Sequence, residues 1–336
     1  MIPDVLRVHP EPFEYHNEAS VHMRIVADPR GYVSFLAQRL TDISSGQCTI
    51  VLPPKALFTD APGEGDFRVM PCIIRYRNET LKVVKVVGTN LVGQMVPDQV
   101  TVGKVLCLNP KENFVSHIFE ACLLSSARTG ACAALAVARL GGEGQNIAIV
   151  GAGRVGYYTG LFLGAIGTVR HVVFADPIAR RAEMMAAEIS KAGLGCTYAA
   201  AASDCVANAD VVVVATTSTK HLFRPEDIAA RLVVSVGADT EQQRELPPEW
   251  ISAADLYVDT MDSFAVGDLR AWRDQLHCDP PIVANLIDLF TPNREVPGSG
   301  KRRVFISTGS GLMDALTVEY LLNASALGAP FGTRDL

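Results

Sequence analysis

The chain has 336 residues, of which 49% are hydrophobic, and this is enough apolar surface for two domain cores. It carries 30 Lys and Arg against 36 Asp and Glu, a formal net charge of -6 at pH 7. An acidic chain whose longest basic run is "KRR" at 301–303 does not fit nucleic acid, because phosphates call for clustered cations. The apolar runs are shorter than a membrane span, and the first twenty residues lack the pattern of a signal peptide. We therefore expect a cytoplasmic protein that binds neither nucleic acid nor a membrane.

The cysteines and histidines do not form a metal-binding pattern. None of the eight cysteines belongs to a Cys-x-x-Cys pair or stands with histidines at ligand spacing. We expect buried, reduced thiols and no metal site. His117 and His221 each stand alone in an apolar stretch, which is more typical of packing residues than of general bases.

The first 120 residues predict a mixed α/β region rich in strands. Strand-like runs occur at 47–53 ("QCTIVLP"), 68–76 ("RVMPCIIRY") and 81–90 ("LKVVKVVGTN"). An Ala-rich helix follows, for which we predict Ser125 or Ser126 as N-cap and the pair Gly141 and Gly142 as the stop.

Strands and helices alternate after residue 145. Apolar strands are predicted at 146–150, 171–176, 196–201, 210–217, 231–239 and 255–260, with helices at 154–166, 177–193 and 311–328. Continuous apolar strands alternating with amphipathic helices are typical of a parallel sheet covered on both faces. The predicted fold class is therefore α/β, with a Rossmann-type doubly wound parallel sheet at 123–308 and a second, mixed α/β domain.

The stretch "IVGAGRVG" at 149–156 predicts a dinucleotide site. Gly151, Gly153 and Gly156 follow a strand and open a helix, with Arg154 and Val155 between them, so a pyrophosphate could lie on the helix N-terminus. Asp176, at the end of the next strand, is placed to bind the ribose hydroxyls and favours NAD over NADP. The nearby Arg180 and Arg181 leave NADP open.

Polar side chains at strand ends complete the cofactor prediction. The hydroxyls of Thr216, Thr217 and Ser218 end the strand "DVVVVATT", at the sheet edge where ligands bind, and we expect contacts with ribose or nicotinamide. An ordinary turn is the alternative reading of this cluster.

Three stretches of the chain carry charged residues that point to substrate chemistry. Lys82 and Lys85 are three apart on one strand and so face opposite sides, and an inward lysine needs an anionic partner. Arg128 is expected in the first turn of its helix, the wrong end for a cation unless an anionic ligand compensates it. Asp239 follows a glycine at a strand end, where catalytic groups collect.

Taken in order, these segments resemble a known family. The stretches "FEACLLSSARTGACAALAVARL", "IAIVGAGRVG", "VGADTEQQREL" and "FISTGSGLMDALTVEYLL" are similar to the ornithine cyclodeaminase and mu-crystallin family over about 65–330. The resemblance implies a homodimer that performs redox chemistry at the C–N bond of an amino or imino acid. It also implies that 1–122 with 309–336 form the substrate-binding and dimerisation domain, and 123–308 the NAD-binding domain.

The resemblance also implies roles for individual residues. Lys85 and Arg128 would clamp the substrate carboxylate, and Asp239, with Lys85 as the second catalytic candidate, would handle the amine and activate water. Arg68 aligns with an upstream arginine of the pocket, Thr101 with a substrate contact and Thr129 with a contact to the cofactor phosphate. Gly130 departs from the family's usual alanine, at a local helix cost of up to about 1 kcal/mol.

Several functions remain open from the sequence. The leading one is an NAD-dependent amino acid dehydrogenase or imine reductase, or an enzyme that cleaves an N-substituted amino acid, as in 2,3-diaminopropionate biosynthesis. Cyclodeamination of ornithine to proline is the second, and a non-catalytic protein that binds a nucleotide and a small ligand is the third.

Overall fold

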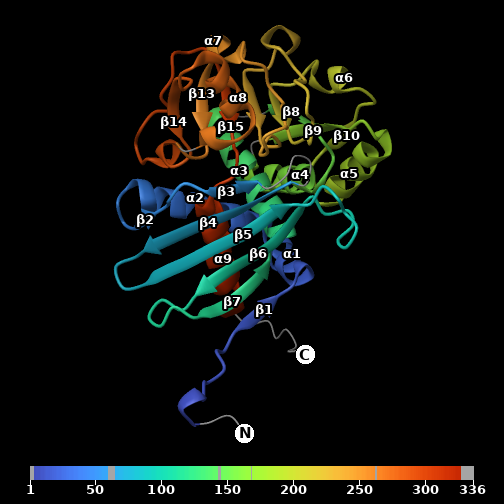
Figure 1. Ribbon diagram of the computed structural model, residues 1–336. Helices are drawn as coiled ribbons and strands as arrows, with labels where there is room; N and C mark the ends of the chain where they lie inside the picture. The colour runs from blue at the N-terminus through green and yellow to red at the C-terminus, as the bar shows by residue number, and fades with distance from the viewer. Residues whose placement is uncertain (1–3, 60–64, 143–144, 168, 262, 327–336) are drawn as a thin grey trace.

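The computed structural model describes residues 4–59, 65–142, 145–167, 169–261 and 263–326, so the end of the predicted segment 309–336 lies outside the described residues. Two β-sheets lie one above the other, with helices between and around them (Figure 1). Both sheets predicted from the sequence are therefore present.

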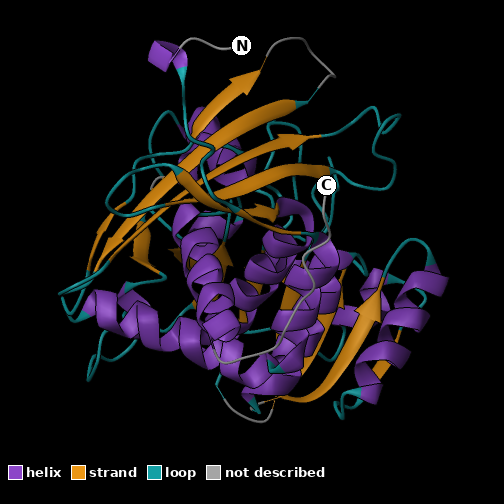
Figure 2. Cartoon of the chain, turned by 90° about the horizontal axis from the view of Figure 1, so that it is seen from below, coloured by secondary structure: helices purple, strands orange, loops and turns teal. Residues whose placement is uncertain are grey.

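The first sheet is mostly antiparallel, in the order β1-β7-β6-β5-β4-β2 with β3 beside β4. Its strands are β1 (Glu14–His16), β2 (Thr49–Val51), β3 (Ala56–Thr59), β4 (Asp66–Arg75), β5 (Thr80–Thr89), β6 (Thr101–Leu108) and β7 (Val115–Glu120). Burial alternates along β4, as expected for a sheet with one covered face. That face packs on helices (Figure 2), among them α1 (Glu18–Ala27), α2 (Pro29–Ser44) and α9 (Gly311–Ala326).

The second sheet is wholly parallel, in the order β10-β9-β8-β11-β12-β15-β13-β14. Its strands are β8 (Gln145–Val150), β9 (Val169–Ala175), β10 (Cys196–Tyr198), β11 (Val211–Val214), β12 (Leu232–Ser235), β13 (Ala254–Val258), β14 (Ile282–Asn285) and β15 (Arg302–Ile306). The chain moves outward in one direction from β8 and in the other from β11. The point between these two strands is where a doubly wound sheet opens its ligand crevice.

Helices cover this parallel sheet. They are α3 (Ala121–Leu140), α4 (Arg154–Ile166), α5 (Ala179–Lys191), α6 (Ala202–Val206), α7 (Trp250–Ala253) and α8 (Gly267–Leu276). Short 3-10 turns occur at η1 (Asp4–Leu6), η2 (Pro225–Asp227), η3 (Ser263–Ala265) and η4 (Asp288–Phe290). The cysteines are free, and most of them are buried as expected, but Cys278 is exposed.

Helix α3 lies between the two sheets, and three predictions about it were wrong. It begins at Ala121 with Glu120 as N-cap, so Ser125 and Ser126 lie inside it and Arg128 is not in its first turn. Contrary to expectation, α3 is long and apolar enough to cross a membrane, but 83% of its apolar window is buried within the protein. A helix packed on all sides is apolar all round, which hides the N-terminal boundary in the sequence.

Gly130 lies in the middle of α3, where this helix crosses α4. A Cβ at Gly130 would lie 2.7 Å from the backbone nitrogen of Thr159 and 2.7 Å from Cβ of Tyr158. The glycine therefore permits the close approach of two helices. Gly130→Ala is expected to lower the free energy of unfolding by about 1–3 kcal/mol, because overpacking outweighs the better helix propensity of alanine.

Urea unfolding of the wild type, of Gly130→Ala and of a second glycine variant would test this expectation. Gly164→Ala on α4 is the matched control, since its Cβ would meet Leu194 at an ordinary 3.4 Å. That variant is expected to be neutral or slightly stabilising. Equal stability of the two variants would contradict the close-approach argument.

Candidate active site

One cavity between the two sheets collects most of the predicted site residues. It has a volume of about 230 Å³ and is lined from both sheets and from α3. The predicted residues along its wall are Arg68, Lys85, Thr101, Arg128, Thr129, Gly153, Arg154, Val155, Thr216, Thr217 and Asp239. Residues that are far apart in the chain thus surround one space large enough for a small ligand.

The glycine-rich turn lies between β8 and α4, where the sequence placed it. Gly151 has a φ of 108°, and a Cβ there would lie 2.2 Å from the carbonyl oxygen of Ala215. A Cβ on Gly156 would lie 2.1 Å from the carbonyl oxygen of Gly151, whereas Gly153 has open space around it. Gly151 and Gly156 permit the tight turn, and Gly153 leaves room for a phosphate to approach the helix N-terminus. The residues present therefore fit a bound dinucleotide.

Asp176 supports this turn from the end of β9. Its carboxylate accepts hydrogen bonds from the backbone nitrogens of Ala152, at 3.0 Å, and Ile178, at 2.9 Å. The acid therefore braces the glycine-rich turn in addition to the ribose contact predicted for it. A second cavity of about 890 Å³, lined by Ala152, Gly153 and Arg181, extends along this side and has room for the adenosine half of a dinucleotide.

A loop of the first sheet reaches the same turn. Arg154 donates a hydrogen bond of 2.7 Å from Nη2 to the carbonyl oxygen of Asp98, a residue with a φ of 59°. This contact joins the loop between β5 and β6 to the start of α4. The two halves of the molecule therefore meet at the glycine-rich turn.

Glu245 holds the ends of β11 and β12 together by hydrogen bonds, and sequence reasoning missed it. Its carboxylate is fully buried and accepts hydrogen bonds from the backbone nitrogen of Thr216 at 2.7 Å and from the Ser235 hydroxyl at 2.6 Å. It also accepts one from the backbone nitrogen of Gly237, and burial raises its pKa to about 7. Thr217 lines the cavity, but Ser218 does not and instead donates to the carbonyl oxygen of Lys220. The predicted cofactor contact of Ser218 is thus not supported.

Lys85 and Arg128 share one buried carboxylate, that of Asp314 in the first turn of α9. The Lys85 Nζ lies 2.8 Å from Oδ2 of Asp314, and the Arg128 Nε lies 3.0 Å from Oδ1. Asp314 is 0% exposed and Lys85 is 1% exposed. The sequence required an anionic partner for both cations and expected a ligand for Arg128, but a side chain of the protein itself fills that place.

Lys85 and Arg128, which we call the clamp, nevertheless keep donors for a ligand. Asp314 accepts a hydrogen bond from Nε of Arg128, and among the described residues no partner accepts one from the two Nη groups of Arg128. Lys85 also donates to the hydroxyl of Ser125, at 3.1 Å. An Arg fork on the cavity wall beside a buried ammonium is suited to binding a carboxylate.

Asp239 faces Arg68 across the cavity. Arg68 Nη1 lies 3.2 Å from Oδ2 of Asp239, and the rest of the guanidinium forms a bidentate pair with Asp66 at 2.9 Å. The Asp239 side chain is 41% exposed, so its carboxylate remains accessible. The direct ionic partner of Asp239 is therefore Arg68 on β4, while Lys85 and Arg128 pair with Asp314.

Three further residues named from the sequence are Thr101, Thr129 and Lys82. Thr101 begins β6 and lines the cavity. Thr129 also lines it, but its hydroxyl donates to the carbonyl oxygen of Ser125 one turn earlier in α3. Lys82 confirms the opposite-face prediction, since it points away from Lys85 and donates to the carbonyl oxygen of Pro110.

The clamp should lose charge in mildly alkaline solution. Burial lowers the pKa of Lys85 to about 8 against the attraction of Asp314, so its ammonium loses a proton above that pH. We expect KM for a carboxylate substrate to rise above about pH 8, while the Kd for NADH stays constant. Lys85→Met should show a raised KM that no longer depends on pH in this range. A wild-type KM that is flat to pH 9.5 would contradict this assignment.

The lowered pKa of Lys85 also affects how the stability of the fold depends on pH. The folded pKa of Lys85 lies below the unfolded value of 10.5, so the unfolded chain binds more protons between these two values. This group by itself therefore makes stability increase with pH through that window, whereas substrate binding weakens. The opposite signs distinguish loss of the clamp from general unfolding.

Comparison with known proteins agrees with this geometry. Residues 17–277 match the ornithine cyclodeaminase/mu-crystallin family. The chain is 28% identical over 287 residues to L-lysine cyclodeaminase from Streptomyces rapamycinicus, covering 82% of this chain and 81% of that protein. It is 23% identical over 302 residues to an NAD(P)H-dependent anabolic L-arginine dehydrogenase from Pseudomonas aeruginosa, covering 87% and 92%.

The fold is that of a solved reductase. The structure of Δ1-pyrroline-2-carboxylate reductase from Thermococcus litoralis, in complex with NADH and L-proline, superposes with a TM-score of 0.81 at 18% identity. The superposition covers 94% of this chain and 98% of that one. The predicted fold class is confirmed, and the prediction of an NAD-dependent enzyme is confirmed at the level of the family. The chain belongs to the ornithine cyclodeaminase/mu-crystallin family.

Proposed function

We propose that the protein is an NAD-dependent enzyme that acts on the C–N bond of an amino or imino acid. The observation that carries this proposal is that one cavity is lined by Lys85, Arg128, Asp239 and the glycine-rich turn. A bound nicotinamide would supply or accept a hydride at the substrate carbon. A carboxylate clamp and an acid–base group on the same cavity are what such a substrate needs.

Each side chain has a distinct part in this proposal. The Nη groups of Arg128 and the ammonium of Lys85 would hold the substrate carboxylate, and Asp314 would keep both cations in place. Asp239 would exchange a proton with the substrate nitrogen, directly or through water. Arg68 would orient the carboxylate of Asp239. Thr101 and Thr129 would offer further polar contacts to substrate and cofactor.

The cofactor assignment rests on the turn and on Asp176. A carboxylate braced at the end of β9 would disfavour the extra phosphate of NADP, so we propose NAD. Arg181, which lines the adjoining cavity, is the residue that could accommodate that phosphate instead. Parallel binding measurements with NADH and NADPH would decide between the two cofactors.

We also propose that the protein is a homodimer. The uncovered face of the first sheet carries exposed apolar side chains from neighbouring strands: Val51, Phe58, Phe67 and Val86. Residues 1–122 with 309–336 would then form the substrate-binding and dimerisation domain, and 123–308 the cofactor domain. Sedimentation of Phe67→Glu beside the wild type would test this, since a charge at the interface should yield monomers.

A substrate panel tests the proposed activity. Ornithine, lysine, alanine, N-carboxyethyl amino acids and cyclic imines would be assayed with NAD or NADH by absorbance, ammonia release and amino acid analysis. A dehydrogenase or reductase changes nicotinamide absorbance in proportion to product. Failure of every amino and imino acid, with NADH binding intact, would favour a binding protein instead.

Cyclodeamination is the second candidate, and the 28% identity to an L-lysine cyclodeaminase favours keeping it. In this reaction ammonia leaves as the ring closes, and the dinucleotide is needed only in catalytic amount. Ammonia release from ornithine or lysine without net change in absorbance would identify it.

A further inference from the structure

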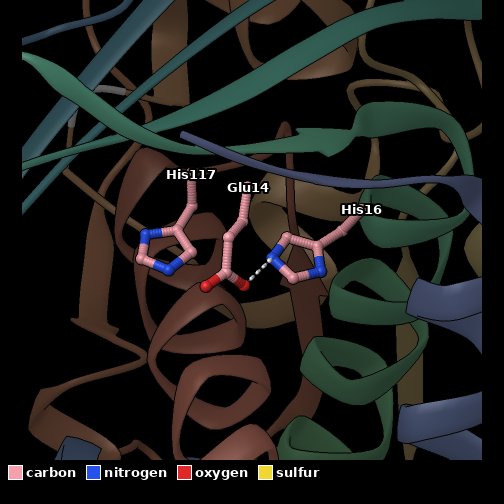
Figure 3. A group of neighbouring side chains, drawn as sticks. All are labelled: Glu14, His16 and His117. Carbon is pink, nitrogen blue, oxygen red and sulfur yellow. Dashed lines mark ion pairs between the residues drawn. The ribbon is translucent and has the colours of Figure 1, made fainter. Parts of the chain in front are cut away.

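Three potential metal ligands, Glu14, His16 and His117, lie close together on strands β1 and β7. These strands are at the edge of the first sheet that is away from the parallel sheet (Figure 1). Glu14 and His16 are two apart on β1 and therefore face the same side. In the parallel pairing of β1 with β7, His117 stands directly opposite Glu14. Figure 3 shows the Glu14 carboxylate between the two imidazole rings, each of which presents a ring nitrogen to it.

The distances are close to those of a coordination site. One ligand atom from each residue lies within 4.8 Å of the others, and His16 Nε2 is 3.8 Å from the nearer Glu14 oxygen. That separation is too long for a hydrogen bond. His16 Nε2 is buried and has no hydrogen-bond partner among the described residues, and the side chain is only 7% exposed. A buried nitrogen without a partner is costly, and a cation beside it would remove that cost.

The hydrogen bonds of His117 leave the correct nitrogen free to coordinate. Ser116 donates its hydroxyl proton to the carbonyl oxygen of Cys107 at 3.1 Å, so toward His117 the hydroxyl oxygen can only accept. His117 Nδ1 lies 3.0 Å from that oxygen and is therefore its donor. Neutral His117 then carries its lone pair on Nε2, which is the arrangement of metal-binding histidines fixed by an outer partner.

One cationic side chain near the cluster is that of Arg24. Arg24 would repel a cation, but its Nη1 donates to the carbonyl oxygen of Leu321 and the carboxylate of Glu14 lies within the cluster.

We propose that Glu14, His16 and His117 bind a divalent transition-metal ion of the Zn²⁺ type, with water in the remaining position. Two imidazoles and one carboxylate are a common ligand set for zinc. Ligands of tetrahedral zinc are about 3.4 Å apart, so the cluster must contract slightly. Glu14 can provide this movement because its side chain is 71% exposed.

The ion would fasten β1 to the sheet. β1 is only three residues long and is paired with one neighbour, β7, at the edge of the sheet. A metal bridging His16 and His117 would add a cross-strand link to that pairing, so its role would be structural. Sequence reasoning did not predict this site, because His117 is far along the chain from Glu14 and His16.

Zinc and cobalt binding to the tag-free, full-length chain tests the proposal. After treatment with a chelator, we expect one equivalent of Zn²⁺ by calorimetry, a higher Tm with zinc, and visible absorption bands with Co²⁺ from a low-symmetry site. Glu14→Gln and His117→Gln should lose this equivalent and the Co²⁺ bands. Glu14→Gln is the safer variant, because an exposed carboxylate can be replaced without disturbing the core.

Matched controls separate this site from adventitious binding. His171→Gln, which removes a histidine of the parallel sheet, and Cys278→Ser, which removes an exposed thiol, should keep the full equivalent. Zinc binding that is lost in these controls but kept in Glu14→Gln would overturn the proposal, as would the absence of any binding to the wild type. NADH binding should be the same in all variants, so the result does not depend on the proposed activity.

Discussion

Asp239→Asn is expected to abolish most turnover while NADH still binds. Asp239 is the accessible carboxylate on the cavity wall, held by Arg68 at 3.2 Å. The amide has nearly the same shape but cannot take up a proton, and loss of a general acid–base group costs about 10²–10⁴-fold in rate. Steady-state kcat and the fluorescence of bound NADH measure the two effects separately.

The control for this variant is a carboxylate of the same type outside the cavity. Asp274→Asn breaks only an exposed contact of 3.5 Å with Arg270 on α8, so its kcat should equal that of the wild type. Wild-type kcat in Asp239→Asn would exclude Asp239 as the proton-transfer group. Loss of NADH binding in the same variant would indicate a structural role instead.

Asp314→Asn is expected to destabilise the fold strongly. Asp314 is the buried partner of both Lys85 and Arg128, and its removal leaves two buried cations without a counter-charge. Removing one partner of a buried ion pair costs about 3–5 kcal/mol. Burial already lowers the pKa of Lys85, so the variant should respond by releasing the proton of Lys85 at still lower pH.

Urea unfolding at pH 7 and pH 9 would measure this effect. The deficit of Asp314→Asn should be smaller at pH 9, because Lys85 of the wild type is then mostly neutral and its ion pair with Asp314 no longer stabilises the wild type. Glu188→Gln, which breaks an exposed ion pair with Lys191, should change stability by no more than about 1 kcal/mol. A deficit of Asp314→Asn that is as small as that of the control would show that Lys85 and Arg128 do not need Asp314.

The sequence by itself determined the parallel sheet and the glycine-rich turn. Their signals are local: the valines of β11 form a continuous apolar run, and Gly151, Gly153 and Gly156 lie where one strand ends and the next helix begins. Turn geometry and strand burial depend on neighbouring residues, so they can be recognised along the chain. Alternation along a strand also predicted that Lys82 and Lys85 face opposite sides, but not which of the two faces inward.

Only the tertiary structure decided which charges pair. Asp314 is more than two hundred residues from Lys85, yet α9 returns to the first sheet and places this carboxylate between Lys85 and Arg128. Glu245 reaches back to the ends of β11 and β12, and Arg68 rather than Lys85 meets Asp239. A buried charge must have a partner, and the sequence expresses this requirement. The identity of the partner follows from how distant segments pack, because Coulomb attraction acts through space and not along the chain.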